Sequence, residues 1–191
     1  MKGGRPMRIL LTGFDDFGNV VDNPSWLAVQ AAAEMLPGAE CVRLPVVYGK
    51  AGERLLEEIR KKKPDFVLSC GAAIGREAVT PELMAINYRY ARLPDNEGVQ
   101  LLGTPALPDG PDAIMNGLPL SEMVETIRSE GFPCALSVSA GSFVCNDLYY
   151  TLLSAQKEMG FRGLFVHVPS ADRVEAEKAA QILVRLIQLA V

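Results

Sequence analysis

Histidine is almost absent from this sequence of 191 residues, which contains one, His167. Any reaction that needs an imidazole as general base must therefore use this residue. Cysteine is also scarce, and none of the four cysteines lies in a C-x-x-C pair or at another metal-ligand spacing, so no metal site is predicted. All four are expected to be free thiols. Cys41, Cys70 and Cys134, which lie within or before expected strands, are interpreted as packing residues.

Long hydrophobic runs and an excess of positive charge are missing as well. No apolar stretch approaches the roughly 18 residues that span a bilayer, and the run Ile9–Leu11 is too short for a signal peptide. The formal net charge is −4, which removes the electrostatic basis for binding nucleic acid or an anionic membrane. We therefore expect a cytoplasmic protein without nucleic-acid or membrane partners.

Glycine-rich nucleotide motifs are absent too. Neither G-x-G-x-x-G nor the P-loop G-x-x-x-x-G-K-[ST] occurs in the sequence. Residues 71–76, with the sequence GAAIGR, have the wrong glycine spacing and no lysine. The signature of a nucleotide-phosphate site is therefore missing.

The features that are present describe an α/β protein. The length favours one domain over residues 1–191, with residues 1–6 expected to be flexible. Short apolar runs alternate with amphipathic segments, which predicts a three-layer α/β/α domain with a mostly parallel, mixed central sheet. The expected strands are 7–12, 41–47, 66–70, 83–88, 134–138 and 163–168, and the expected helices are 24–35, 51–62, 121–130, 143–159 and 173–189. A long loop is expected from residue 95 to residue 119, and such loops are usually functional or part of an interface.

Two residues suggest nucleophilic chemistry. Cys145 lies in the first turn of an expected helix, where the helix dipole favours a thiolate and lowers the pKa, and where free amides can stabilise an oxyanion. His167 ends a buried strand, and both residues are expected at the carboxyl edge of the sheet, where ligands collect. Each residue could instead be a packed core residue.

A catalytic imidazole is normally oriented by a carboxylate. Four acidic residues are candidates for this role, and spacing alone does not choose among them: Glu82, Asp95, Glu97 and Asp147. Asp147 is the weakest on geometry, because positions i and i+2 of a helix do not face each other.

Seven segments then occur in an order that resembles the pyroglutamyl peptidase I (pyrrolidone carboxyl peptidase) family, cysteine peptidases that remove an N-terminal pyroglutamate. They cover about residues 7 to 170 and read TGFDDFG with NPSW (12–18, 23–26), LPV (44–46), GAAIGR (71–76), PE with AIN (81–82, 85–87), ARLPDNEG (91–98), AGSFVCN (140–146) and HVP (167–169).

The resemblance implies a role for particular residues. Cys145 is the nucleophile, His167 the general base and Glu82 the carboxylate that orients the imidazole, without a metal or organic cofactor. The substrate would be held by the aromatic walls Phe14 and Phe17, by the backbone near Ala72, and by Arg92, Leu93, Phe143 and Val144. The implied reaction is thiolate attack on the pyroglutamyl carbonyl, followed by hydrolysis of a thioester. The resemblance also implies a dimer or tetramer, and the apolar residues Leu101, Leu102, Leu107 and Ile114 of the long loop are compatible with an interface.

Several positions depart from the family pattern. Asp16 replaces a proline of the loop that carries Phe14 and Phe17, Asn19 replaces a glycine, and Ile74 replaces a glycine beside Arg76. Asp147 stands where the family often has His, and a carboxylate near the thiol is expected to oppose thiolate formation. The segment after residue 169 is shorter than in the family. Two alternatives therefore remain: a thiol hydrolase of another small amide or lactam, and a non-catalytic α/β binding protein.

Overall fold

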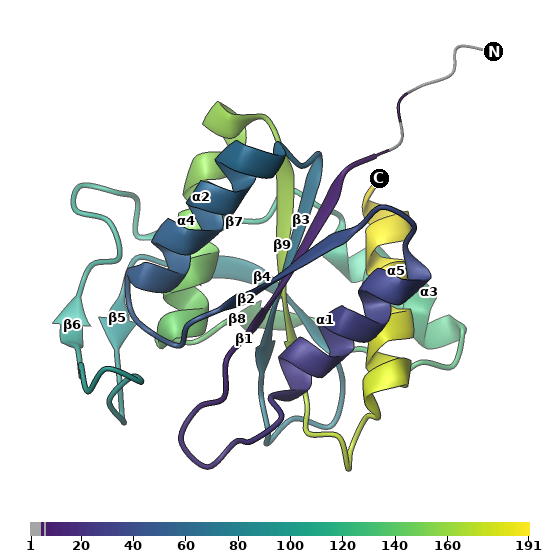
Figure 1. The fold of residues 1–191 in the computed structure, drawn as a ribbon, viewed down its shortest axis with the longest axis horizontal. Helices are drawn as coiled ribbons and strands as arrows, with labels where there is room; N and C mark the ends of the chain where they lie inside the picture. The colour runs from purple at the N-terminus through teal and green to yellow at the C-terminus, as the bar shows by residue number, and fades with distance from the viewer. Residues whose placement is uncertain (1–4, 6) are drawn as a thin grey trace.

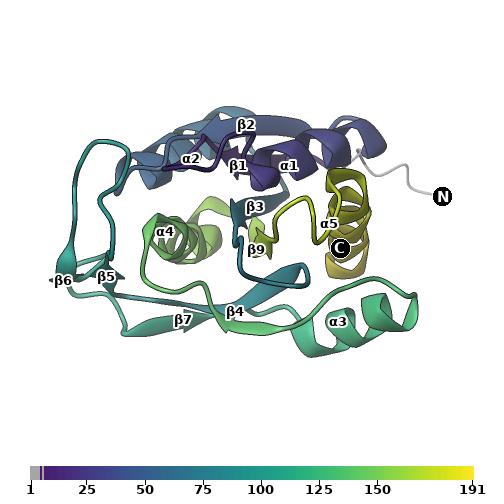
Figure 2. The same ribbon diagram turned by 90° about the horizontal axis from the view of Figure 1, so that it is seen from below.

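A computed structural model describes residue 5 and residues 7–191. The prediction that residues 1–6 are flexible falls, apart from residue 5, outside these described residues. The chain forms three layers, with a twisted sheet between two groups of helices, as Figures 1 and 2 show. The predicted mixed α/β/α architecture is confirmed. No helix in the described part is long and apolar enough to cross a membrane.

Within residues 7–191, the main sheet has seven strands in the order β2-β1-β3-β9-β4-β7, with β8 also paired to β4. The strands are β1 (Ile9–Phe14), β2 (Glu40–Leu44), β3 (Phe66–Ala72), β4 (Thr80–Ile86), β7 (Ala113–Met115), β8 (Ser137–Ser139) and β9 (Arg162–Val168). β1, β2, β3 and β9 are parallel to one another, whereas β4 runs antiparallel to β9 and to β7. A separate two-stranded arm is formed by β5 (Arg89–Tyr90) and β6 (Leu102–Thr104).

In the described part of the chain, five helices cover the two faces of the sheet. They are α1 (Pro24–Met35), α2 (Lys50–Lys62), α3 (Leu120–Ser129), α4 (Val144–Met159) and α5 (Ala176–Ala190). The start of α1 follows from its sequence, because Asn23 caps the helix by accepting a hydrogen bond from the Ser25 amide, and proline occupies the first turn. Helix α4 ends at Gly160, whose φ of +71° suits glycine.

The core is divided by the sheet into two hydrophobic clusters. Neighbouring residues of one strand, such as Leu10 and Leu11, belong to different clusters because strand side chains alternate between faces. One cluster packs under α1, α3 and α5, and the other under α2 and α4. In Figure 2 these two groups of helices lie on opposite sides of the sheet.

The central part of the chain differs most from the sequence prediction. The expected loop from residue 95 to residue 119 contains β6 and β7, and β4 begins three residues before the expected strand at residue 83. These strands were missed because β6 and β7 have three residues each and their ladder partners are distant in sequence. The expected strand 134–138 is reduced to β8, with one isolated bridge between Cys134 and Val79.

Candidate active site

His167 and Glu82 form a buried polar pair on two neighbouring strands. The ladder between β4 and β9 places Thr80 opposite His167, so Glu82 lies two residues further along β4. His167 Nδ1 is 2.6 Å from Glu82 Oε1, and the Glu82 side chain is completely buried. This contact fixes the orientation of the imidazole ring and leaves its second nitrogen, Nε2, available for proton transfer.

Glu82 is held in its ionised form. Burial alone would raise the pKa of this carboxyl, but the hydrogen bond with His167 and the nearby Arg76 charge hold the pKa below its ordinary value. Arg76 Nη1 donates to the same oxygen, Oε1, at 2.6 Å and also contacts the Thr80 hydroxyl. A carboxylate in this position stabilises a positive charge on the imidazole.

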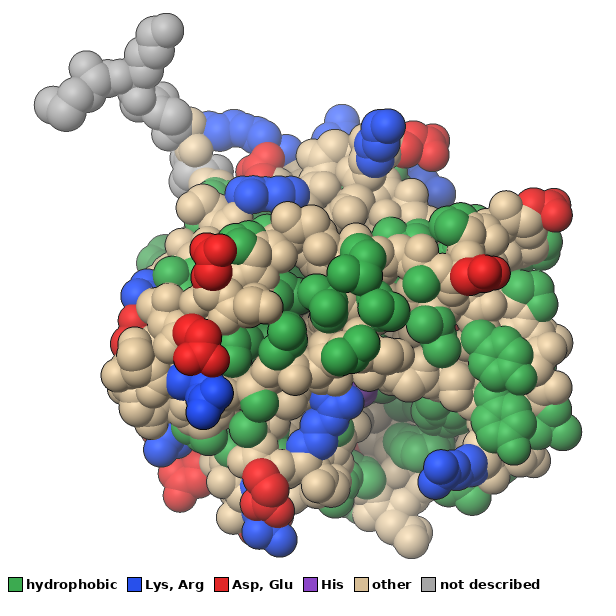
Figure 3. Space-filling model, turned by 180° about the vertical axis from the view of Figure 1, so that it is seen from behind, with side chains coloured by type: hydrophobic (Ala, Val, Ile, Leu, Met, Phe, Trp, Pro, Cys, Tyr) green, Lys and Arg blue, Asp and Glu red, His purple; other side chains and the backbone are tan. Residues whose placement is uncertain are grey.

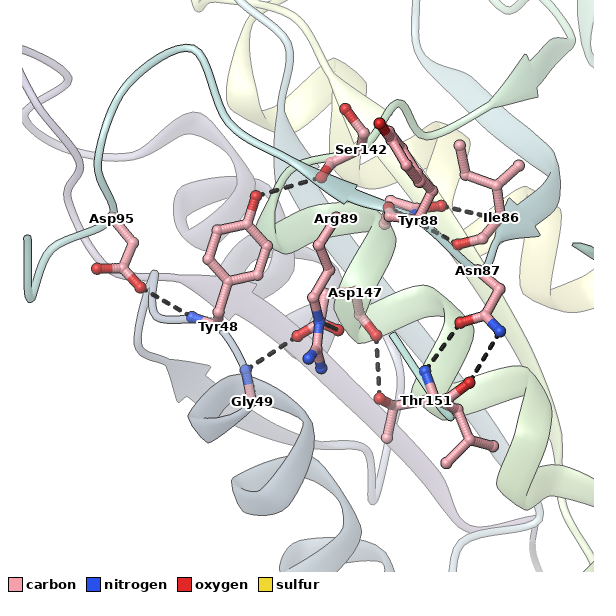
Figure 4. Close-up of polar contacts among 12 residues, drawn as sticks. Tyr48, Gly49, Ile86, Asn87, Tyr88, Arg89, Asp95, Ser142, Asp147 and Thr151 are labelled. Atoms are coloured by element: carbon pink, nitrogen blue, oxygen red, sulfur yellow. Dashed lines mark hydrogen bonds and ion pairs between the residues drawn. The ribbon is translucent and has the colours of Figure 1, made fainter. Parts of the chain in front are cut away.

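The other three acidic candidates are engaged elsewhere. Asp95 accepts hydrogen bonds from the backbone amides of residues 48, 97 and 99. Glu97 pairs with Lys50 on the surface at 2.6 Å. Asp147 accepts from the Gly49 amide at 2.9 Å and from Arg89 Nε at 2.6 Å, and Figure 4 shows this arrangement beside the start of α2. The structure therefore selects Glu82, which spacing alone could not do.

The Cys145 thiol lies next to the imidazole. Cys145 is the second residue of α4. A Cβ atom built on Gly71, at the end of β3, would lie 2.8 Å from Cys145 Sγ and 3.3 Å from His167 Cδ2. The thiol and the Nε2 side of the imidazole therefore border the same small space, which a side chain at residue 71 would occupy.

The route by which these two residues meet differs from the prediction. His167 is at the carboxyl end of its strand, as expected. However, β8, the strand before Cys145, is parallel to β4 and thus antiparallel to β9. Residues 140–143 therefore turn the chain back, so that α4 begins beside His167. The prediction places both residues after strands that end at one carboxyl edge of the sheet. It is confirmed for His167, but it is wrong for Cys145, because the strand before Cys145 runs in the opposite direction.

The pKa of the Cys145 thiol is raised to about 12, mainly by burial and secondly by the Glu82 charge. Arg76 and the Cys145 amide act in the opposite direction without outweighing burial. The expected lowering by the helix dipole is therefore not the net result. The charge that opposes thiolate formation is that of Glu82 and not, as expected, that of Asp147. A neutral resting thiol needs a base to become a nucleophile, and His167 is the adjacent one.

The Cys145 thiol lies at the N-terminal end of α4, within hydrogen-bond reach of its own backbone amide. Phe143 is the N-cap of α4, and within the described residues no side chain caps this helix. The first amides of a helix have no intrahelical acceptor. The amides at the start of α4 are thus available to a negatively charged oxygen formed at Cys145.

An apolar cavity of about 180 Å³ has Cys145 in its wall. Phe14, Phe17, Ala72 and Phe143, all predicted from the sequence, line it. The Phe17 and Phe143 rings are 5.2 Å apart and tilted by 49°, and Tyr48 meets Phe143 edge-on at 5.5 Å. We call this space the thiol cavity; its size and aromatic walls suit a small flat ring.

Three predicted pocket residues are not part of the thiol cavity. Arg92 and Leu93 line an adjoining cavity instead, which is described below. Val144 is completely buried, packs into the core under α2 and α4 and lines neither cavity. As the first residue of α4, its side chain points into the molecule, so the prediction of a wall formed by Val144 is wrong.

The loop that carries the aromatic walls is tied by polar contacts. A tight turn brings Phe17 and Val20 together through two backbone hydrogen bonds, with Gly18 at φ +55°. Asp16 Oδ1 accepts from the Asn23 amide at 3.1 Å and from Arg43 Nη2 at 3.0 Å. The family pattern has a rigid proline at position 16. In this chain Asp16 restrains the loop there through hydrogen bonds instead.

Sequence reasoning missed several residues of this region. Arg76 contacts Glu82, and Asn23, which caps α1, lines the thiol cavity together with Val20 and Val46. The sequence offers one sign of the role of Arg76: it is a cation in the short connection before the strand that carries Glu82. Ile74, a departure from the family pattern, lines the thiol cavity and is 45% exposed. Asn19 lies exposed on the loop outside the thiol cavity.

The four thiols are free, as expected. Cys70 and Cys134 are buried packing residues, but Cys41 is exposed, so its interpretation as a packing residue is wrong. Cys41 lies on β2, the outer strand of the sheet, most of whose residues are exposed. Among residue 5 and residues 7–191, no group of three or more His, Cys, Asp or Glu side chains could hold a metal ion.

Known proteins share this sequence and this fold. The model of the family "Pyroglutamyl peptidase" matches residues 7–186. The chain is 42% identical over 181 residues to a pyrrolidone-carboxylate peptidase of Bacillus amyloliquefaciens, with 92% of this chain and 84% of the relative covered. It is 44% identical over 167 residues to one from Streptococcus pneumoniae, covering 85% and 78%.

Solved structures agree with this relationship. The crystal structure of Bacillus amyloliquefaciens pyroglutamyl peptidase I superposes with a TM-score of 0.88 at 38% identity, over 97% of each chain. A mutant pyrrolidone carboxyl peptidase of Pyrococcus furiosus superposes with a TM-score of 0.85 at 30% identity, over 96% of this chain and 98% of that one. With its sequence, its fold and its thiol–imidazole site in agreement, this chain belongs to the pyroglutamyl peptidase family of cysteine peptidases.

Proposed function

We propose that this protein is a cysteine exopeptidase that removes an N-terminal pyroglutamate from peptides, with Cys145, His167 and Glu82 as its catalytic residues. One observation carries the proposal: Cys145 and His167 border one space, and the imidazole is oriented by a buried carboxylate. The thiol cavity beside this group has the size and the aromatic walls that a lactam ring requires.

In the first half of the reaction, Cys145 Sγ attacks the pyroglutamyl carbonyl carbon while its proton passes to His167 Nε2. The negative charge on the carbonyl oxygen is stabilised by the free amides at the start of α4. Glu82 stabilises the imidazolium that forms. The C–N bond then breaks, and His167 returns the proton to the leaving amine, which leaves a thioester on Cys145.

In the second half, His167 takes a proton from water as the water oxygen attacks the thioester carbonyl. The C–S bond breaks, and the proton returns to the Cys145 sulfur. Pyroglutamate leaves as the free acid. The atoms balance with water as the only co-substrate, and each proton transfer uses the same imidazole.

The apolar thiol cavity explains the preference for pyroglutamate over an ordinary N-terminal residue. The lactam is uncharged and flat, so its faces can pack against Phe17 and Phe143. A free amino terminus is charged at neutral pH, and its desolvation in an apolar cavity is unfavourable. We expect the backbone near Ala72 to pair with the lactam amide.

The test is hydrolysis of a pyroglutamyl coumarin amide by the wild type and by Cys145→Ala. We expect the variant to lose all measurable turnover, and Cys41→Ala, which removes an exposed thiol, to keep it. Persistent turnover by Cys145→Ala would remove the thiol from the mechanism. A prolyl and a glutaminyl coumarin amide serve as comparison substrates, and a rate on either equal to the pyroglutamyl rate would contradict the proposed specificity.

One observation favours a second function, hydrolysis of another small amide or lactam. Ile74 places a branched side chain in the wall of the thiol cavity. Ile74→Gly distinguishes the two functions. Pyroglutamyl turnover that is weak in the wild type and rises at least tenfold in this variant would show that the natural cavity is shaped for a different ring.

A second copy of this chain is the proposed macromolecular partner, as a dimer or tetramer. Hydrophobic side chains gather in patches on the face drawn in Figure 3. Leu102 and Leu107 of the central segment are exposed, whereas Leu101 and Ile114 pack against the core and are poor interface candidates. Sedimentation of the wild type and of Leu102→Asp tests this partner.

We also propose a cytoplasmic location, and the four free thiols support it, because cysteines stay reduced in that compartment.

A further inference from the structure

A second cavity adjoins the thiol cavity. It has a volume of about 360 Å³, twice that of the thiol cavity at about 180 Å³. The two cavities share two aromatic residues, Phe17 and Phe143, which form the wall between them. We call the larger space the side cavity.

The side cavity is built mainly from apolar groups. Besides the two shared rings, Tyr90 from β5 and Leu93 line it, and both are largely exposed, at 45% and 63%. Surfaces of this kind gain most from covering an apolar or aromatic side chain. Arg92 supplies the only charge in the lining, and among the described residues it forms no ion pair.

The position of the side cavity along the chain indicates what occupies it. Residues 140–142 line it and lead through Phe143 and Val144 directly to Cys145. Tyr48 holds this segment by donating from its hydroxyl to the Ser142 carbonyl at 3.2 Å (Figure 4). The Ser142 hydroxyl in turn donates to the Tyr90 carbonyl at 2.9 Å. The wall beside the thiol is therefore preformed.

We propose that the side cavity binds the side chain of the residue that directly follows pyroglutamate, and that it favours a large apolar or aromatic residue there. The inference rests on the proposed function. When the lactam fills the thiol cavity and its carbonyl reaches Cys145, the next residue must leave that cavity. One residue advances the chain by about 3.5 Å, so its side chain enters the nearest open space.

Arg92 makes the side cavity selective for short substrates as well. In a pyroglutamyl dipeptide, the carboxylate follows immediately after the side chain in the side cavity. The unpaired Arg92 guanidinium in the lining can form a charge-assisted hydrogen bond with it. The side cavity therefore favours pyroglutamyl dipeptides with a large apolar second residue.

The experiment compares kcat/KM for pyroglutamyl-phenylalanine and pyroglutamyl-alanine. We expect the wild type to favour the phenylalanine peptide about tenfold, which is the scale expected for burying an aromatic ring on a half-exposed surface. In Leu93→Ser the ratio should fall to about threefold or less. Met115→Ser is the matched control, because Met115 is a similarly exposed apolar residue on β7 outside both cavities, and its ratio should equal that of the wild type.

The carboxylate is tested with pyroglutamyl-phenylalanine and its C-terminal amide. We expect the free acid to be preferred by roughly two- to fivefold, because Arg92 is exposed and its ion pair is screened by solvent. Arg92→Gln should abolish this preference, whatever its effect on the absolute rate.

The outcomes separate the two proposals. Hydrolysis of both dipeptides with equal kcat/KM, or an unchanged ratio in Leu93→Ser, overturns the side cavity as a binding site and leaves the peptidase intact. If the wild type cleaves neither dipeptide nor the coumarin amide, the proposed function fails and the inference fails with it.

Discussion

The catalytic group and the loop that forms the pocket are built in different ways. Glu82 and His167 lie on adjacent strands, are almost completely buried and meet at 2.6 Å. The loop from residue 14 to residue 23 instead carries Phe17 on a partly exposed turn, restrained by the ion pairs of Arg43 with Asp15 and Asp16. Low dielectric strengthens the interactions of the first region, and solvent screens those of the second. We therefore expect sequence changes in this loop to affect the proposed chemistry less than changes at Glu82 or His167.

The largest effect is expected at the carboxylate. Glu82→Gln keeps the shape but removes the charge that stabilises the imidazolium, so kcat should fall by roughly 10³- to 10⁴-fold, as for comparable changes in other triads. The kinetics of a pyroglutamyl amide measure it. Glu97→Gln is the control, because within the described chain this surface carboxylate pairs with Lys50 alone, and a similar loss there would contradict the assignment.

A smaller loss is expected at Arg76, which links the catalytic group to solvent. Arg76→Gln removes a charge that lowers the pKa of Cys145. The thiol pKa should rise further, and both kcat and the rate of Cys145 alkylation at a fixed alkaline pH should fall about tenfold, the equivalent of one pKa unit.

Two further variants test whether the charge of Arg76 is the cause. Arg76→Lys should recover part of the alkylation rate, because a cation remains. Arg173→Gln removes an exposed arginine that pairs with Glu77 and should leave the pH profile unchanged. Equal alkylation profiles in the wild type and Arg76→Gln would show that Arg76 does not tune the thiol. Cys41→Ser as background removes the exposed thiol from the assay.

The pocket loop should respond through substrate binding. Phe17→Ala removes a ring that lines both cavities, and we expect KM to rise roughly tenfold with kcat changed less than threefold, the pattern of lost uniform binding. Val21→Ala is the control, since Val21 is 73% exposed on the same loop. A loss confined to kcat would mean that Phe17 affects the chemical step and not substrate binding. The pocket loop would then not differ in role from Glu82 and His167.

The smallest effect is expected at Asp16. Asp16→Ala removes one of two carboxylates that bind Arg43, and Asp15 remains at 2.9 Å from Arg43 Nε. Because exposed ion pairs contribute little, KM should rise by about twofold at most. The same kinetic assay measures it, and a tenfold rise would show that this contact is as important to the pocket as the aromatic ring.

Local sequence signals predicted much of the fold. The helix over residues 24–35 was predicted from its cap and proline, and the buried strands from their apolar runs between Gly and Pro. The short strands β6 and β7 were not predicted, because pairs distant in the sequence stabilise them, whereas the strand expected at 134–138 is present only as the shorter β8. For the site, the helix start drew attention to Cys145, but a dipole argument alone predicted a lowered thiol pKa. Burial reverses that direction, and burial is a property of the folded chain.

The sequence by itself determined which chemistry is available, since one imidazole and one thiol at a helix start leave few alternatives. Residue spacing left four carboxylates open as partners of the imidazole; the family resemblance pointed to Glu82, and the tertiary structure shows the contact between Glu82 and His167. Asp95, Glu97 and Asp147 have other partners, and the ladder of β4 with β9 brings Glu82 to His167. It also decided that Arg92 and Leu93 line a second cavity. The physical reason is the same in both cases: strand pairing and loop packing join residues that are far apart in the sequence, such as Glu82 and His167 at 85 positions, and local propensity contains no information about such contacts.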